Sequence, residues 1–403
     1  METLISNVTL VLPERLCGPE AWLMAKDGRI AGFGVGHQPD VPGARRLDGC
    51  GAYLCPGFVD THVHGGGGAD FRDGTEEAYL RALHVHLAGG TTTIVPTLSS
   101  ATKETMLQSI SVFNHLKGNE DALSSIPRLA GLHLEGPYFS QQQRGAQDPE
   151  IIRDPDPAEY REILAATPHI RIWSIACELP GALELGRELA GRGICASIGH
   201  SNATAEQAIA AVEAGYSSVT HLYSSCSYLH RNGPYREGGV VEAAFLLRDL
   251  DVEVIADGVH LPPLFLRLIY GIKGAEHITL VTDCIRPGGV PCHEGDMSYD
   301  DVGKKHPVYL ENDVAVVPDR SSFAGSIATT SRLVRTMVQK CGVGLPEAVR
   351  MASLNPARRL GLGGEIGSIA LGKRADLLLL DRQLVVQRVL LSGDEVPLTM
   401  GQE

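Results

Sequence analysis

The sequence predicts an eight-stranded parallel β/α barrel of the TIM type, joined to a small β-sandwich domain built from both termini. Short apolar runs alternate with helical or loop segments along the middle of the chain, which is typical of parallel strands with crossover connections. We expect strands at residues 54–60, 92–97, 128–135, 170–176, 194–200, 218–221, 252–257 and 278–283. Eight such units, with polar residues at strand carboxyl ends, indicate a barrel.

Both ends of the chain instead show short alternating runs that are separated by glycine turns. Residues 4–11, 21–25 and 29–34 have this pattern near the start, and residues 377–380 and 385–391 repeat it near the end. Such alternation is typical of β-strands joined by turns. We therefore expect one composite β-sandwich domain from residues 1–54 and 362–403, with residues 55–361 forming the catalytic barrel.

The composition argues against several classes of protein. The formal net charge is −13 over 403 residues with no basic stripe, so no nucleic-acid partner is expected. Nine cysteines without a repeating spacing favour reduced thiols and a cytoplasmic location. The first residues lack a signal-peptide pattern, and no apolar run approaches the roughly 20 residues of a membrane span, so no membrane contact is expected. Without a P-loop or a Gly-x-Ser-x-Gly elbow, nucleotide hydrolysis and serine-esterase chemistry have no support.

Several predicted strands end in residues that can hold a metal. His62 and His64 are two apart, which places both rings on one face of a strand, and Glu135, His200 and His221 each close another strand. The carboxyl ends of parallel barrel strands meet at one mouth. Imidazoles and carboxylates are ligands for a divalent transition metal. The sequence therefore predicts a metallo-hydrolase barrel that binds a divalent ion, with Zn²⁺ as first choice and Fe²⁺ as the alternative.

Other polar residues near the same strand ends have candidate roles. Asp283 ends the last strand, where a carboxylate can accept the proton of an attacking water and pass it to a leaving nitrogen, although a helix N-cap is the alternative. His260 follows the seventh strand and could bind a substrate hydroxyl or phosphate, unless it is an ordinary loop residue. His133 is expected to be an interior, hydrogen-bonded residue. The remaining histidines, such as His84, His86 and His115, are expected at the surface.

Together these residues resemble the amidohydrolase superfamily, and more narrowly its N-acetylglucosamine-6-phosphate deacetylase branch. The resembling motifs span nearly the whole chain. They are Pro56-Gly57-Phe58-Val59-Asp60-x-His62-x-His64-Gly65, Gly131-Leu132-His133-Leu134-Glu135-Gly136-Pro137, Gly199-His200-Ser201-x-Ala203-Thr204, Thr220-His221-Leu222-Tyr223, Ile255-Ala256-Asp257-Gly258-x-His260, Val281-Thr282-Asp283, Ala324-Gly325-Ser326 and Gly372-Lys373-x-Ala375-Asp376.

The resemblance implies roles for particular residues. Glu135, His200 and His221 would hold one ion, His62 and His64 would add ligands for a second, and Asp283 would be the acid and base. The implied substrate is a small amino-sugar phosphate, N-acetyl-D-glucosamine 6-phosphate. Members are usually homodimers in which the neighbouring subunit can lend an arginine to the phosphate. The expected substrate contacts are His260, Ser224, Ser225, Arg231, Arg236 and Ala324.

Departures from the family pattern leave the substrate open. Ser224-Ser225-Cys226 stands where the family usually has Asn-Ala-Met, and Tyr235-Arg236-Glu237-Gly238-Gly239 follows an insertion where it has Arg-(Asp/Glu)-Pro-Gly. Cys284 replaces the common Ala after the aspartate. N-acetylgalactosamine 6-phosphate, an N-acyl amino acid or a cyclic amide are the alternative substrates, and a binding scaffold without catalysis is the alternative class.

Overall fold

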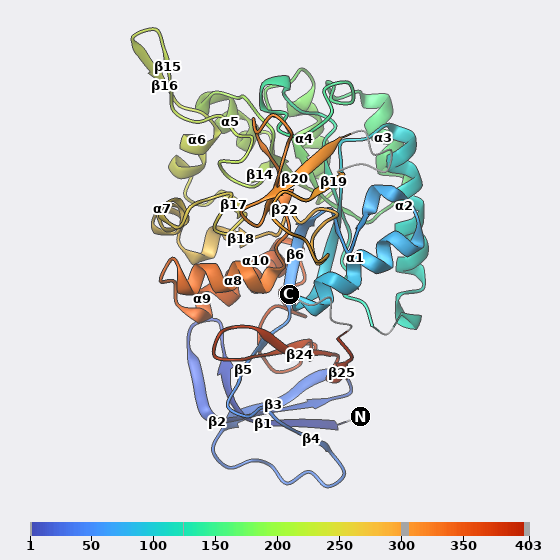
Figure 1. The fold of residues 1–403 in the computed structure, drawn as a ribbon, viewed down its shortest axis with the longest axis vertical. Helices are drawn as coiled ribbons and strands as arrows, with labels where there is room; N and C mark the ends of the chain where they lie inside the picture. The colour runs from blue at the N-terminus through green and yellow to red at the C-terminus, as the bar shows by residue number, and fades with distance from the viewer. Residues whose placement is uncertain (1, 124, 300–305, 399–403) are drawn as a thin grey trace.

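The barrel predicted from the sequence is present in the computed structural model, which describes residues 2–123, 125–299 and 306–398 (Figure 1). Its strands are parallel and hydrogen-bonded in chain order, and each expected strand has a counterpart. The barrel strands are β6 (Phe58–Val63), β9 (Thr91–Ser99), β11 (Leu132–Glu135), β12 (Ile170–Ile175), β13 (Cys195–Ile198), β14 (Tyr216–Val219), β17 (Asp251–Val254) and β18 (Ile278–Leu280). The short strand β10 (Arg128–Leu129) precedes β11 and also pairs with β9.

Helices follow most of these strands and cover the barrel from outside (Figure 1). Four of these helices begin after an N-cap residue whose side chain accepts a backbone N–H bond. The N-cap residues are Thr75, Thr102, Asp156 and Thr204. The helices are α1 (Glu76–Ala88), α2 (Lys103–Gly118), α3 (Pro157–Ala166), α4 (Ala182–Gly191), α5 (Ala205–Glu213), α6 (Val240–Leu246), α7 (Pro263–Lys273), α8 (Thr330–Gln339), α9 (Leu345–Ala352) and α10 (Leu354–Arg359).

Hydrogen bonds from the segment after β18 to β6 connect the first and last barrel strands. The backbone N–H of Asp283 donates to the carbonyl of His62 over 2.8 Å. The buried carboxylate of Asp60 accepts the hydroxyl of Thr282 over 2.6 Å. The carbonyl of Cys284 accepts the backbone N–H of His64 over 2.8 Å. These bonds hold the predicted metal ligands of β6 against the predicted catalytic aspartate.

The two ends of the chain form one mixed sheet below the barrel in Figure 1. In β23, Leu377 and Leu379 pack into the core of this terminal sheet, whereas Leu378 and Leu380 pack into the barrel core. The period of two along a strand lets one segment serve both cores. The strands are β1 (Glu2–Val11), β2 (Leu16–Lys26), β3 (Arg29–Val35), β4 (Arg45–Asp48), β5 (Tyr53–Pro56), β23 (Leu377–Leu380), β24 (Val386–Leu391) and β25 (Asp394–Val396). The exact domain boundaries stay a prediction.

Two segments that are not part of the regular β/α units follow the carboxyl ends of barrel strands. A hairpin of β15 (His230–Asn232) and β16 (Tyr235–Glu237) follows β14 and projects away from the barrel (Figure 1). A four-stranded antiparallel sheet follows β18, and we call it the flap. Its strands are β19 (Met297–Tyr299), β20 (Pro307–Glu311), β21 (Val314–Val316) and β22 (Phe323–Ser326). No helix among the described residues combines the length and apolar character needed to cross a bilayer.

The expectation that His86 lies at the surface was wrong. His86 lies on the inner face of α1 and is fully buried. Its Nε2 is 2.9 Å from the carbonyl of Gly65, which follows the predicted ligand His64. The helical periodicity of the segment was correct, but a histidine on the inner face replaces an apolar residue because a loop carbonyl needs a donor there.

Candidate metal centre and active site

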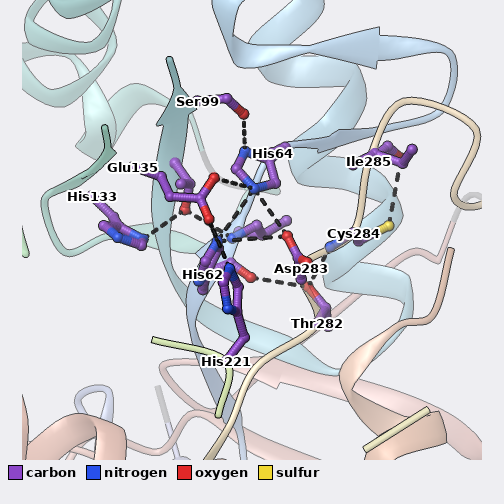
Figure 2. A network of polar contacts seen from close by, with 12 residues as sticks. His62, His64, Ser99, His133, Glu135, His221, Thr282, Asp283, Cys284 and Ile285 are labelled. Carbon is purple, nitrogen blue, oxygen red and sulfur yellow. Dashed lines mark hydrogen bonds and ion pairs between the residues drawn. The ribbon is translucent and has the colours of Figure 1, made fainter. Parts of the chain in front are cut away.

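The side chains predicted to bind metal converge at the carboxyl ends of the barrel strands. Figure 2 shows His62, His64, Glu135, His221 and Asp283 pointing toward one another. The Nε2 atoms of His62 and His64 lie 3.2 Å apart. Glu135 Oε1 is 3.0 Å from His221 Nε2, and Asp283 Oδ1 is 3.0 Å from His64 Nε2.

His200 joins the same cluster from the end of β13. Its Nε2 is 3.2 Å from Glu135 Oε1, and its ring stacks on Phe139 with centroids 4.2 Å apart. Glu135 is therefore the carboxylate that the imidazoles of His62, His200 and His221 all face, and its other oxygen is 3.4 Å from His64 Nε2. The structure brings all five predicted metal ligands and Asp283 together.

Each imidazole has an acceptor on the ring nitrogen that faces away from the cluster. His200 Nδ1 lies 2.9 Å from the carbonyl of Gln143, and His221 Nδ1 lies 3.0 Å from the carbonyl of Ser224. A carbonyl only accepts, so Nδ1 carries the proton and Nε2 is left as a lone-pair donor. Such outer hydrogen bonds are the usual arrangement around metal-ligating histidines.

The donor set fits a divalent transition ion. Donor atoms about 2.0–2.2 Å from an ion in tetrahedral geometry lie roughly 3.4 Å from one another. Among the described residues, two triads have ligand atoms that all lie within 4.8 Å of one another: His62, His64 and Asp283, and His62, Glu135 and His221. Mixed nitrogen and carboxylate donors suit Zn²⁺ and Fe²⁺ and not a hard ion such as Ca²⁺, which prefers oxygen alone.

Electrostatics also favour positive charge at the centre of the cluster. Burial works against a charged imidazole, but the carboxylates of Glu135, Glu253 and Asp283 outweigh it and raise the pKa of His62 to about 10. Burial likewise disfavours a charged carboxylate at Asp283, yet the hydrogen bond from His64 and the imidazoles lower its pKa to about 2. A proton or a divalent cation can supply the charge, so metal binding competes with protonation of His62.

Strained backbone positions three of these side chains. His200, His221 and Asp283 have φ angles of 47°, 27° and 48°, in the left-handed region that favours glycine. Such strain concentrates at functional sites, where the surrounding structure holds it. Gly65, which follows His64, allows a close backbone approach in the same region. A Cβ at this position would lie 2.1 Å from the carbonyl oxygen of Ala69.

A cavity of about 380 Å³ opens over the cluster. Its lining includes the predicted contacts Ser224, Ser225, His260 and Ala324. His260 is held by the buried Asp257, whose Oδ2 is 2.7 Å from His260 Nδ1. The remaining His260 nitrogen can therefore serve a ligand in the cavity, which suits its predicted role.

Arg231 and Arg236 lie apart from the cavity that their own chain forms. They sit directly opposite each other on the β15–β16 hairpin, and neither is among the cavity-lining residues. Of the lining residues that the structure describes, Arg320 in the flap is the one arginine. Its Nε donates to Glu311 over 2.9 Å. The phosphate role of Arg231 and Arg236 stays a prediction and needs a second chain.

Sequence reasoning missed several residues at the site. Ser99 Oγ lies 2.8 Å from His64 Nδ1. Gln147 donates to Glu135 Oε2 over 3.2 Å and lines the cavity. Glu253 Oε2 lies 3.1 Å from His62 Nδ1. Of these three residues, only Glu253 had a sequence signal, since it is an acidic residue between two valines of β17. His133 meets hydroxyls, Thr97 Oγ1 at 3.2 Å and Ser174 Oγ at 2.8 Å, as an interior histidine should.

The side chain of Cys284 fills a space in the packing beside the site. Its sulfur fills the space over Gly288, where an added Cβ would lie 2.1 Å from it. The thiol is fully buried, and burial raises its pKa well above the usual range. Cys284 is therefore a packing residue beside the site, and its carbonyl bonds to the His64 segment.

The fold and the donor set define a metal-dependent hydrolase built on a β/α barrel. Residues 53–396 match the model of the Amidohydrolase family, and the chain belongs to this family. The N-acetylgalactosamine-6-phosphate deacetylase of Escherichia coli O157:H7 is 34% identical over 94% of this chain and 97% of the relative. The N-acetylglucosamine-6-phosphate deacetylase of Lysinibacillus sphaericus is 32% identical over 98% of this chain and 97% of the relative.

A solved structure agrees over the whole length. It is a variant of the N-acetyl-D-glucosamine-6-phosphate deacetylase from Mycobacterium smegmatis, in complex with N-acetyl-D-glucosamine-6-phosphate. It aligns with a TM-score of 0.87 at 34% identity, covering 98% of this chain and 99% of that chain. The chain is therefore an amidohydrolase, a metal-dependent enzyme that hydrolyses an amide.

Proposed function

We propose that the enzyme removes acetate from N-acetyl-D-glucosamine 6-phosphate, leaving the amino sugar 6-phosphate. The observation that carries this proposal is the convergence of four imidazole Nε2 atoms on Glu135, with Asp283 at the same mouth. Relatives named as deacetylases of acetylated hexosamine 6-phosphates at 32–34% identity support the substrate class. The cavity of about 380 Å³ over the cluster has room for a single sugar phosphate.

Asp283 is placed to move the proton. Its carboxylate is ionised, lines the cavity and lies beside the predicted ligands. It accepts a proton from water as the water oxygen attacks the acetyl carbon, and it returns that proton to nitrogen as the C–N bond breaks. When bound, a divalent ion supplies Lewis acidity here, lowering the pKa of water towards about 7 and polarising the amide carbonyl.

Five residues would hold the metal: His62, His64, Glu135, His200 and His221. Zn²⁺ is the proposed ion, with Fe²⁺ as the alternative for the same donors. The two triads share His62, whose Nε2 can bind one ion only, so one or two ions per chain are proposed. Elemental analysis of protein purified without added metal would identify the ion and its number.

We propose a homodimer that forms through one apolar surface, which we call the α7 surface. On α7, Leu264, Phe265 and Leu268 are 72%, 39% and 45% exposed, and helical spacing puts them on one side. Tyr223, which lines the cavity, packs on Phe265 with centroids 5.5 Å apart. Exposed apolar patches mark interaction sites. Helix α6, which carries the exposed Leu246, and the hairpin lie on the same side of the barrel as α7 (Figure 1). Dimerisation through this side would bring a hairpin arginine towards the partner's cavity.

The cytoplasm is the proposed location. All nine cysteines are free thiols, and several of them are buried in the cores. Free buried thiols persist in a reducing compartment.

Acetate release tests the function. The purified enzyme is offered N-acetyl-D-glucosamine, N-acetyl-D-galactosamine and both 6-phosphates, together with an N-acetyl amino acid. We expect the largest kcat/KM with N-acetyl-D-glucosamine 6-phosphate, and loss of activity on chelation that added Zn²⁺ reverses. Equal rates with phosphorylated and plain sugars, or full activity in metal-free protein, would contradict the proposal. A preference for the galactose epimer would move the substrate within the same class.

A further inference from the structure

A charged pair is buried inside the barrel behind His62. Glu253 lies within β17, and its side chain is 0% exposed. Arg359 ends α10, and its side chain is 9% exposed. Arg359 reaches the barrel interior near the start of β13, where its Nη2 is 3.6 Å from Cys195 Sγ. The pair thus approaches the metal centre from the end of the barrel opposite the cavity.

The geometry joins this pair to one metal ligand. Glu253 Oε2 is 3.1 Å from His62 Nδ1, and Glu253 Oε1 is 3.6 Å from Arg359 Nη1. Glu253 Oε1 has no hydrogen-bond partner among the described residues, so His62 provides the one side-chain hydrogen bond of this carboxylate there. A buried carboxylate without a balancing charge is unfavourable, and Arg359 supplies that charge.

His62 differs from the other three imidazoles in the kind of acceptor it meets. His200 and His221 face backbone carbonyls, and His64 faces the Ser99 hydroxyl, which can donate or accept. An ionised carboxylate only accepts, so Glu253 forces the proton onto His62 Nδ1 and leaves Nε2 free to bind metal. It also makes the imidazole a stronger donor.

We propose that Glu253, paired with Arg359, is a positioning residue that sets the tautomer of His62 and thereby retains the ion bound by His62 and His64. The proposal rests on the metal centre described above, not on the identity of the substrate. The ion of Glu135, His200 and His221 depends less on Glu253, because Glu135 Oε1 meets His200 and His221 at 3.2 and 3.0 Å without it.

The alternative is that the pair only stabilises the barrel, as residues at the amino-terminal end of barrel strands commonly do. The two roles predict different losses. A purely structural pair would lower the unfolding temperature and weaken both ions together when it is broken. A positioning role weakens one ion selectively in a protein that is still folded.

The test is metal binding by Glu253→Gln. Chelator-stripped protein is equilibrated with stepped, buffered concentrations of free Zn²⁺, and bound Zn²⁺ per chain is counted by elemental analysis. We expect one of the two ions to bind about 10- to 100-fold more weakly, the usual effect of losing an outer hydrogen bond, with the other ion unchanged. The unfolding temperature of the metal-free variant should match that of metal-free wild type.

Two further variants complete the design. Glu276→Gln is the matched control, because Glu276 pairs with Arg350 at 2.8 Å at the surface and touches no ligand; its Zn²⁺ binding should equal wild type. Should Glu253→Gln fail to fold, Glu253→Gln/Arg359→Met removes both buried charges and is tested for the same selective loss.

Unchanged affinity for every ion would overturn the proposal, as would equal weakening of both ions. In a wild-type chain that binds one ion, the affinity for that ion is the readout, and no change in Glu253→Gln again overturns it. Because no substrate is used, failure of the acetate-release assay would contradict the proposed function while leaving this measurement decisive for Glu253.

Discussion

Asp283 lines the cavity beside His64, and its proposed place in the chemistry follows from what surrounds its carboxylate. Burial disfavours its charge, yet the hydrogen bond from His64 and the nearby imidazoles lower its pKa to about 2. It is therefore ionised throughout the neutral range and ready to accept a proton. Its backbone is held in the left-handed region at φ 48°, with its N–H bound to His62. Asp283 is thus positioned by the ligand strand itself.

Asp283→Asn is expected to lower kcat by about 100-fold or more, the scale of general acid–base catalysis. The amide keeps the shape of the side chain but cannot take up the proton of water. Steady-state kinetics and metal analysis on the same preparation check this, and metal content should stay near wild type because Glu135 and the imidazoles remain. A variant that loses its metal but keeps its rate per bound metal would make Asp283 a ligand and not the base.

At the scale of elements, the predicted ligands lie at or just after the carboxyl ends of β6, β11, β13 and β14, so parallel strand geometry brings them to one mouth. The β15–β16 hairpin and the flap depart from this regular scaffold and contain the arginines that are predicted or tested as phosphate contacts. Loops on a rigid scaffold commonly carry binding residues.

Arg231→Ala or Arg236→Ala is expected to weaken apparent affinity for a 6-phosphorylated substrate by about 1.5–3 kcal/mol, as for a hydrogen bond to a charged group. KM for the unphosphorylated sugar should barely change, because the guanidinium binds only the phosphate. Kinetics with both substrates check this, with Arg187→Ala on outer helix α4 as the control. A larger effect from Arg320→Ala than from either hairpin variant would place the phosphate contact in the flap of the same chain.

Helix α1 is joined to the ligand loop through His86, which gives a pH-dependent contribution to stability. Burial lowers the pKa of His86 to about 4, against about 6.5 in an unfolded chain. Below pH 6.5 the unfolded chain therefore binds a proton that the folded chain does not. The free energy of unfolding consequently falls as the pH is lowered. Between pH 8 and pH 5 this residue accounts for a loss of about 2 kcal/mol.

His86→Gln should remove that part of the loss. Its free energy of unfolding in chelator should fall by about 2 kcal/mol less than that of wild type between pH 8 and pH 5. Urea unfolding at each pH checks the difference. The control is His115→Gln at the exposed end of α2, for which the free energy of unfolding should vary with pH as it does in wild type. Parallel pH profiles for His86→Gln and wild type would show that His86 is protonated in the folded state.

At the scale of the whole molecule, the α7 surface is an apolar surface that the single chain leaves exposed. It adjoins the cavity through Tyr223 and Phe265 and lies on the same side of the barrel as the hairpin. Association through it would therefore link oligomeric state to substrate recognition.

Leu264→Glu/Leu268→Glu is expected to convert a dimer into a monomer, because burying two carboxylates in an apolar interface is unfavourable. Sedimentation velocity checks the mass, and KM for the phosphorylated substrate should rise in the monomer if a partner arginine is lost. Leu371→Glu, at a residue 68% exposed in the loop before β23, is the matched control and should remain dimeric. A monomeric wild-type protein would contradict the proposed assembly.

The sequence by itself predicted the barrel and a β domain built from both termini, and it selected the five predicted ligands and Asp283, which the fold brings together. These depend on local patterns, since strand periodicity and a polar residue at a strand end are readable within a few positions of each other. The resemblance to the family then supplied roles. The same local reasoning placed His86 wrongly, because the partner of His86 is the carbonyl of Gly65, which lies in a different segment.

Only the tertiary structure decided which residues contact the predicted ligands from the side that faces away from the metal cluster. Glu253 meets His62 across 191 positions of sequence, and Arg359 reaches Glu253 from α10. No local pattern encodes such pairs, because closing the barrel brings β17 and β6 together in space. The location of Arg231 and Arg236 outside their own cavity was likewise decided by the direction of a hairpin, which the spacing of residues along the chain does not specify.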